Sequence, residues 1–285
     1  MRYFRDRARP VEAMHAHFDR HTYHRHAHET YSFGVTEIGA QAFTCRGEAH
    51  TSAAGMVMAF NPDEPHDGWS ATPGGFTYRM VHIGPSLISR VLADAGDSHS
   101  SLPLFLSPVL ADPVLARGVE RLHESLTEDP LRQAEVLTST VLRLIRRGAT
   151  KPPRVASLPS ARSTREIAAR TRSVLAERFA EPVTADELAA ATDASRYAVY
   201  RAFQATYGQS PSDYQRQLRL RLARDMLSAG RSAAEAAAVA GFADQAHMTR
   251  WFVRYFGLTP SAYRQAARRP SLDQLHGRPK VVVAG

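Results

Sequence analysis

The chain has 285 residues, of which 44% are hydrophobic and 22% charged, and its formal net charge is +8. This length allows one or two domains, and the composition is that of an ordinary globular protein. No run reaches the ~18 consecutive apolar residues of a membrane span, and the charged start of the chain lacks a signal-peptide core. The single cysteine, Cys45, excludes an internal disulfide framework. We therefore expect a cytoplasmic protein with no membrane partner.

The positive charge is concentrated in one segment. Residues 1–162 hold 18 Lys and Arg against 17 Asp and Glu, whereas residues 163–270 hold 16 Arg against 10 acidic residues. Such a local excess is expected where phosphates are bound. A general preference for arginine would produce the same excess, so charge alone does not decide for nucleic acid.

The N-terminal half predicts strands followed by helices. Within residues 18–85, short β-prone runs alternate with turn signals such as Pro73-Gly74-Gly75, which favours a small sandwich or barrel. From about residue 112 the apolar period becomes helical, and Asp129-Pro130 separates two amphipathic helices. Residues 112–147 are therefore expected to form a helical hairpin, which either covers the barrel or pairs with a second copy.

The chain is accordingly predicted to have two domains of α+β class. Residues 1–150 form the first domain, with a β-barrel and the helical hairpin. Residues 151–163 are rich in proline without apolar period, and form a linker. Residues 164–268 form an all-α domain with two helix-turn-helix motifs, and residues 269–285 are expected to be a disordered tail.

The C-terminal domain contains an internal repeat. Ser195 can cap a helix that ends before Gly208, and Asp244 can cap a helix that ends before Gly257. Each of these helices follows a short helix and a tight turn, which is the arrangement of a helix-turn-helix motif. An ordinary helical bundle would explain the buried Leu and Phe, but not the repeated capped turn with exposed arginines at matching positions. The repeat therefore predicts DNA binding.

These motifs resemble the AraC/XylS family signature over about 100 residues. The resemblance rests on Ser195 through Phe203, Gly208 to Pro211 with Tyr214, Gly241-Phe242, and Arg250 through Pro260 with Tyr263-Arg264. It implies a transcription regulator, usually an activator, with promoter DNA and RNA polymerase as partners, and it supports a homodimer. No enzyme activity and no cofactor are expected. The residues expected to face outward toward DNA are Ser195, Arg196, Tyr197, Tyr200 and Arg201 in the first unit and Gln245, His247, Thr249 and Arg250 in the second.

Histidines form the main chemical signal outside this domain. On a strand, His24, His26 and His28 point to one face, and His66 and His82 could join them from other strands. The pattern resembles the cupin barrel, whose histidines and glutamate hold a metal, although the spacing of Glu29 and His66 departs from the cupin motifs. Regulators with such a barrel commonly bind a small effector without metal. The residues expected to bind an effector are His24, His26, His28, Tyr31, His66 and His82, and a metal, if one is bound, would use His26, His28 and His66.

Three classes of function remain open at this point. The first is a regulator in which a small effector shifts the population between arrangements of the two domains. The second is a metal-dependent cupin enzyme fused to a DNA-binding domain, which would carry about one metal per chain. The third is an architectural DNA-binding protein without an effector, which would show weak sequence preference.

Overall fold

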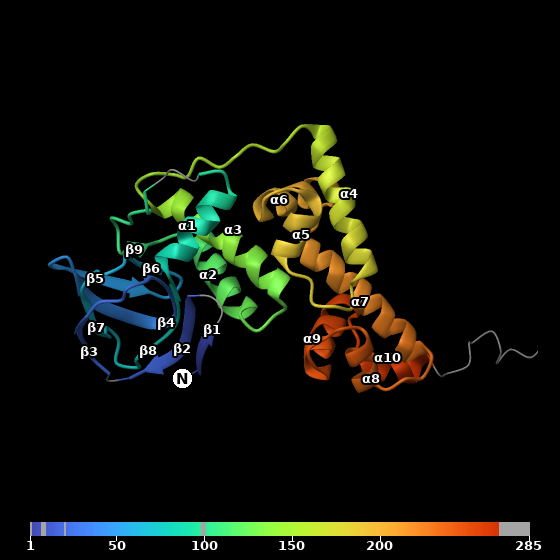
Figure 1. The fold of residues 1–285 in the computed structure, drawn as a ribbon. Helices are drawn as coiled ribbons and strands as arrows, with labels where there is room; N and C mark the ends of the chain where they lie inside the picture. Colours follow the sequence, from blue (N-terminus) through green and yellow to red (C-terminus); the bar gives the residue numbers. More distant parts are fainter. Residues whose placement is uncertain (1, 7–9, 20, 98–100, 268–285) are drawn as a thin grey trace, which may run out of the picture. The chain divides into compact units, whose positions relative to one another are not determined.

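The computed structural model describes residues 2–6, 10–19, 21–97 and 101–267 (Figure 1). The expected tail, 269–285, lies outside them. Contacts divide the chain into two compact units, Met1–Thr171 with Thr184–Ser210, and Arg172–Val183 with Pro211–Gly285. The first helix-turn-helix motif thus groups with the N-terminal residues, whereas the second belongs to the other unit. The domain boundaries expected from the sequence stay a prediction.

The first unit begins with antiparallel strands. They are β1 (Arg2–Asp6), β2 (Val11–Phe18), β3 (Tyr23–His26), β4 (Tyr31–Cys45), β5 (Glu48–Ala53), β6 (Val57–Phe60), β7 (His66–Ser70), β8 (Phe76–Ile83) and β9 (Val109–Leu110). The order β1-β2-β8-β4-β6-β9 is extended by β5 and β7 on the second half of β4, and by β3 on β7. The strand β4 changes partners near Gly39, where φ is 72° and a Cβ would collide with the carbonyl oxygen of Gly75. The sheet therefore wraps around an interior.

Alternation along β8 separates two cores. Tyr78 and Met80 belong to the interior core of the wrapped sheet, whereas Val81 and Ile83 pack with the helices on its other face. This period of two is what a strand with both faces buried requires. His82 has the parity of Tyr78 and Met80, and it is therefore placed on the interior side.

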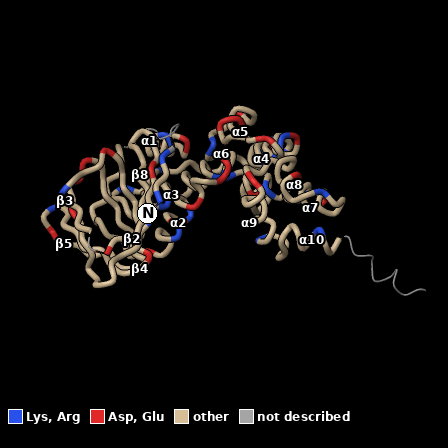
Figure 2. Tube along the Cα trace, turned by 90° about the horizontal axis from the view of Figure 1, so that it is seen from below, with Lys and Arg blue, Asp and Glu red and all other residues tan. Residues whose placement is uncertain are grey.

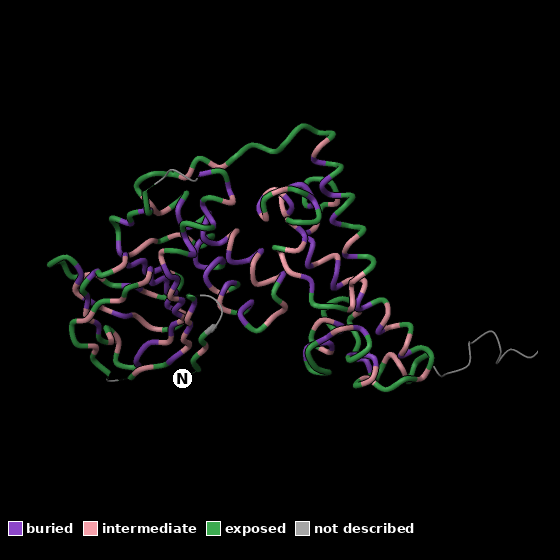
Figure 3. The backbone as a smooth tube through the Cα atoms, viewed as in Figure 1, coloured by how far each residue is buried: buried purple, intermediate pink, exposed green. Residues whose placement is uncertain are grey.

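Three helices cover the outer face of the sheet: α1 (Pro85–Asp94), α2 (Pro113–Ser125) and α3 (Pro130–Gly148). The side chains of Asp112 and Asp129 cap α2 and α3, and proline follows each cap. The expected hairpin is present, and its apolar stripes are buried against the sheet (purple in Figure 3). Of the two arrangements left open by the sequence, covering the barrel or pairing with a second copy, the structure has the first, because these stripes form core within one chain.

The expected linker is tied to α1. The backbone N–H of Arg154 donates to the Asp97 carboxylate at 2.8 Å, and the N–H of Ala156 donates to the carbonyl oxygen of Ala95 at 2.6 Å. Its residues otherwise lie mostly exposed (Figure 3). The helix α4 (Ala161–Glu177) begins before the expected end of the linker at residue 163.

The helices after α4 follow the repeat seen in the sequence. They are α5 (Ala185–Thr192), α6 (Arg196–Tyr207), α7 (Pro211–Ser228), α8 (Ala233–Val239), α9 (Gln245–Phe256) and α10 (Pro260–Ala267). Both α6 and α9 end at a left-handed glycine, Gly208 (φ 70°) and Gly257 (φ 72°). Both basic and acidic residues occur along these helices (blue and red in Figure 2). Among the described residues, no helix is long and apolar enough to cross a bilayer.

The second unit has a core of its own. Buried alanines of α8 allow close contact with Phe252 of α9, which is fully buried and packs on Phe256 (ring centroids 4.5 Å) and on Tyr263 (5.6 Å). Arg216 of α7 is buried, lies 3.7 Å from the ring centroid of Trp251 and pairs with Asp213 at 2.6 Å. Apolar packing and this cation–π contact hold α7 and α9 together.

Candidate functional site

The first reading head is defined here as α5 with α6. Thr184 and Glu187 form a reciprocal capping box at the start of α5, and Asp193 ends it in a left-handed conformation (φ 52°). The Ser195 hydroxyl then accepts from the N–H of Ala198 and starts α6. Short caps at both sides of a tight turn fix the angle between the two helices.

Most of the residues expected to read DNA in α6 are partly accessible. Ser195 is exposed, and Arg196, Tyr200 and Arg201 are half-buried. The expectation that Tyr197 points outward was wrong, because it is only 8% exposed and belongs to the core on the helical face of the sheet. Its hydroxyl accepts from Arg201 at 2.8 Å, so Tyr197 positions that guanidinium.

The second reading head is α8 with α9. Ser232 caps α8, and Asp244 caps α9 by accepting from the N–H of His247. Gly241 in the turn has φ 78°, and a Cβ there would collide with the carbonyl group of Ala180. A glycine is therefore required for the approach of this turn to the segment after α4.

The accessible face of α9 differs in one residue from the expectation. Gln245 and Arg250 are exposed and Thr249 is half-buried. His247 was expected to point outward, but it is 5% exposed and its Nε2 accepts from the indole N–H of Trp251 at 3.1 Å. Its place three residues after the cap turns it toward the core, where it meets Phe242 edge-on.

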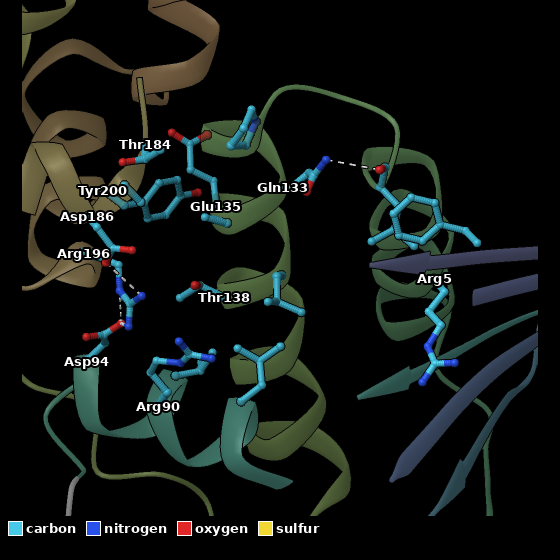
Figure 4. A pocket seen from close by; sticks show the side chains of 18 residues that line it. Arg5, Arg90, Asp94, Gln133, Glu135, Thr138, Thr184, Asp186, Arg196 and Tyr200 are labelled. Carbon is cyan, nitrogen blue, oxygen red and sulfur yellow. Dashed lines mark hydrogen bonds and ion pairs between the residues drawn. The ribbon is translucent and has the colours of Figure 1, made fainter. Parts of the chain in front are cut away.

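The start of α6 is bound by the C-terminal end of α1 (Figure 4). The Ser195 hydroxyl donates to the backbone carbonyl oxygen of Asp94 at 2.8 Å. The Arg196 guanidinium makes two contacts of 2.5 and 2.6 Å with the Asp94 carboxylate and a further one of 3.1 Å with Asp186 of α5. Two residues expected to contact DNA are thus engaged within the first unit. We call this set of contacts the Asp94 clamp.

A cavity of about 650 Å³ adjoins the Asp94 clamp. Its lining combines apolar residues of α1 and α3, such as Leu87 and Leu137, with the charged side chains of Arg90, Asp94 and Arg196 (Figure 4). Neither the cavity nor the Asp94 clamp was predicted from the sequence. A single aspartate at the end of a helix belongs to no motif, so no sequence signal pointed to it.

Histidines meet inside the wrapped sheet. One ring nitrogen each of His26, His28 and His66 lies within 4.8 Å of the other two. His82 lies beside His28, with ring centroids 4.6 Å apart, and its Nδ1 lies 2.8 Å from the Ser32 hydroxyl. Four of the six residues expected at an effector site are therefore together.

Two residues expected at this site lie elsewhere. His24 is exposed, because the pairing of β3 with β7 shifts register between Tyr23 and His26 and breaks the strict alternation. Tyr31 points to the other face of β4, where its hydroxyl donates to the carbonyl oxygen of Pro103 at 2.7 Å and burial raises its pKa to about 12. The expectation that His24 shares one face with His26 and His28 was wrong.

Burial favours the neutral imidazole of His28, His66 and His82. It lowers the pKa of His28 to about 4, with contributions from His82, His26 and His66, and it lowers the pKa of His66 and His82 as well. Neutral imidazoles at physiological pH offer a lone pair to a hydrogen-bond donor or a metal ion.

Comparisons with known proteins agree with this architecture. Residues 10–145 match the AraC-like ligand binding domain, and residues 188–266 match a helix-turn-helix domain. The chain is 28% identical over 226 residues to the HTH-type transcriptional regulator YbfI of Bacillus subtilis (strain 168), covering 78% of this chain and 80% of that protein. It is 40% identical over 86 residues to the HTH-type transcriptional regulator GbdR of Pseudomonas aeruginosa, covering 30% of this chain and 23% of that protein.

Among solved structures, the chain is similar to the DNA-binding domain of AdpA in complex with a target DNA. The identity is 29% and the TM-score 0.35, covering 37% of this chain and 98% of that one. The two domain matches confirm the predicted fold class, with a β-rich N-terminal domain followed by a helical helix-turn-helix domain. The chain belongs to the AraC-type family of transcriptional regulators, with a ligand-binding domain and a helix-turn-helix DNA-binding domain.

Proposed function

We propose that an effector bound in the N-terminal domain controls DNA binding by releasing the first reading head from the Asp94 clamp. The single observation that carries this proposal is the engagement of both Ser195 and Arg196 by Asp94. The Arg196 donors that contact Asp94 and Asp186 are not available to a phosphate or a guanine edge. Full engagement of DNA by Ser195 and Arg196 therefore requires the clamp to open.

The DNA contacts proposed for α6 are Arg196, Tyr200 and Arg201, with Ser195 at the phosphate backbone. Arginine can bridge the O6 and N7 atoms of guanine, and each such pair contributes about 1–3 kcal/mol of discrimination. Tyr197 is assigned a supporting role instead, because it is buried and holds Arg201.

The proposed contacts of α9 are Gln245, Thr249 and Arg250. Glutamine can bridge the N6 and N7 atoms of adenine in the major groove. His247 is buried and supports Trp251, so it is removed from the set of proposed base contacts.

We place the effector in the interior of the wrapped sheet, at His26, His28, His66 and His82. The site is half-buried to buried, it is next to the apolar side chain of Phe60, and it offers neutral polar groups, which is the usual mixture of a small-molecule site. Effector binding would favour one arrangement of the helices on the outer face over the other, which is a population shift.

Family membership supports the remaining proposals. The proposed partners are promoter DNA, RNA polymerase and a second copy of the chain. A cytoplasmic location and the absence of enzyme activity are proposed on the same ground. The homodimer is proposed from family membership alone, since the apolar stripes of α2 and α3 are buried within one chain. A sharp monomer in sedimentation at micromolar concentration, with and without operator DNA, would exclude it.

The clamp can be tested on an operator found by genome-wide footprinting. We expect Asp94→Ala to raise the affinity of the effector-free full chain for this operator by about tenfold, or 1.4 kcal/mol, measured by fluorescence anisotropy. Asp186→Ala is the matched control, because it removes the same charge from a second partner of Arg196 within the reading head itself. Equal affinities of Asp94→Ala and wild type, or an equal gain in the control, would overturn the clamp.

A further inference from the structure

Trp251 of α9 is held by groups from two helices. Its indole N–H donates to Nε2 of His247, one turn earlier in α9, at 3.1 Å. The guanidinium of Arg216 on α7 lies over the ring, 3.7 Å from its centroid, and that of Arg254, one turn later in α9, lies 5.0 Å from the same centroid. Both distances are within the ~6 Å at which the face of an indole ring attracts a cation. The ring therefore links a buried cation of α7 to an exposed cation of α9.

Stability alone does not explain why an arginine stands at position 216. Arg216 is 3% exposed and pairs with Asp213 at 2.6 Å, but its Nη2 is buried without a hydrogen-bond partner among the described residues. A buried guanidinium with an unsatisfied N–H group costs free energy, and an apolar side chain of similar volume is often as stable or more stable in such a place. What the charged side chain adds is its attraction to the ring of Trp251.

Arg254 stands beside the residues of α9 that are proposed to read DNA. It is exposed, and α9 contains no Asp or Glu that could neutralise it. Arg250 lies one turn before it, so both guanidinium groups start from the same side of the helix. A cation in the last turn also interacts favourably with the helix dipole. That interaction needs only the charge, whereas the contact with Trp251 also sets the direction of the side chain.

We propose that Arg254 binds a DNA phosphate next to the bases read by α9, and that Arg216 positions it through Trp251. Arg216 holds the ring from α7, and the ring in turn holds Arg254. An arginine that is oriented before binding loses less side-chain entropy when it contacts a phosphate. Such a contact adds affinity without reading sequence, and it complements the base contacts proposed for Gln245 and Arg250. The inference rests on the proposed function in that α9 has to lie in the major groove.

The phosphate contact is tested by the salt dependence of DNA affinity. Full-length wild type and Arg254→Gln are titrated by fluorescence anisotropy with the operator and with a scrambled duplex of equal length. One phosphate contact contributes about 0.9 to the slope of log K against log salt, which corresponds to about fivefold in affinity between about 0.15 M and 1 M salt. We expect Arg254→Gln to lose this slope and this affinity on both duplexes. Arg221→Gln is the matched control, since Arg221 is exposed on another side of α7.

The positioning role is tested with Arg216→Met and with the conservative Arg216→Lys. We expect Arg216→Met to lower the affinity for both duplexes by about two- to threefold without lowering the thermal midpoint of unfolding. Arg216→Lys should retain most of the affinity, because an ammonium group also attracts the indole ring. In an Arg254→Gln background, Arg216→Met should cause no further loss. A residue that only supports the fold would instead lower the midpoint and weaken binding whether or not Arg254 is present.

Opposite results would overturn each part of the proposal. A loss confined to the operator, an unchanged salt slope, or a loss equal to that of Arg221→Gln overturns the phosphate contact. Equal effects of Arg216→Met with and without Arg254 overturn the positioning role. Arg250→Ala, measured in the same series, separates this inference from the proposed function. If Arg250→Ala weakens operator binding and Arg254→Gln does not, only the inference fails. If neither has an effect, α9 does not read DNA and both fail.

Discussion

The two reading heads are built alike and held differently. In both, a side-chain cap starts the second helix and a left-handed glycine ends it. The first head, however, packs against α1 and α3 and gives Tyr197 to their core, whereas α8 and α9 share a core with α7 and α10. The repeat duplicates the structure that reads DNA but not its surroundings. The first head is thus packed on the helices of the N-terminal unit, and the second keeps Gln245 and Arg250 exposed.

The largest expected effect is a loss of stability of the second reading head when its own core is disrupted. Phe252→Ala removes a fully buried ring and should lower the free energy of unfolding of the second unit by about 3–5 kcal/mol. Hydrogen exchange should show lost protection in residues 211–267 and unchanged protection in β4 and β8. Lost protection in these strands as well would show that the two units unfold as one.

An effect of intermediate size is expected on operator affinity, and it should differ between the exposed Arg250 and the clamped Arg196. Arg250→Ala should lower operator affinity by about 1–3 kcal/mol, because Arg250 is exposed and ready to contact a base or a phosphate. Arg196→Ala should cost less without effector, since the wild type first has to give up the pair with Asp94. Anisotropy titrations at one salt concentration measure both, with Arg143→Ala on exposed α3 surface as the control for charge. Equal losses for Arg196 and Arg250 would contradict the asymmetry.

The smallest expected effect is a decrease in the stability of the effector domain at acidic pH. Burial, with Arg79 and His15, lowers the pKa of His123 in α2 to about 4, so the folded state prefers the neutral ring. Stability is then fully present above the unfolded pKa of about 6.5 and is lost as the pH falls toward 4. Between pH 7.5 and 5 we expect His123 to contribute a loss of about 1 kcal/mol, discounted for partial exposure, beside the losses from His28, His66 and His82, and His123→Gln removes this part. Chemical denaturation curves at the two pH values measure it, and an unchanged pH dependence in His123→Gln would refute the assignment.

Much of the C-terminal domain could be predicted from its sequence, because caps, turns and helix ends are local. Ser195, Gly208, Asp244 and Gly257 mark these points by chemistry that needs no partner elsewhere in the chain. The errors arose where polarity was taken as a sign of exposure. Tyr197 and His247 carry polar atoms, yet a hydrogen bond to Arg201 or to Trp251 allows each to lie in a core.

The effector domain was harder to predict in detail, because its site depends on the pairing of distant strands. A register shift in β3 removes His24 from a face that simple alternation would give it. The helix α1 carries Leu87 and Val91 into the core and ends at Asp94, but its contact with α6 joins residues about a hundred positions apart. No local pattern encodes such a contact.

The segment that connects the N-terminal helices to α4 is anchored near the Asp94 clamp. Ala156 is hydrogen-bonded to the end of α1, and only residues 157–160 separate it from α4. This anchor shortens the chain that joins the two sides of the clamp, and a covalent link of this kind raises their effective concentration above that of separate molecules. A contact too weak to persist between separate molecules is then stable within one chain. The clamp should therefore be lost when the chain is cut within residues 157–160 and the two parts are mixed.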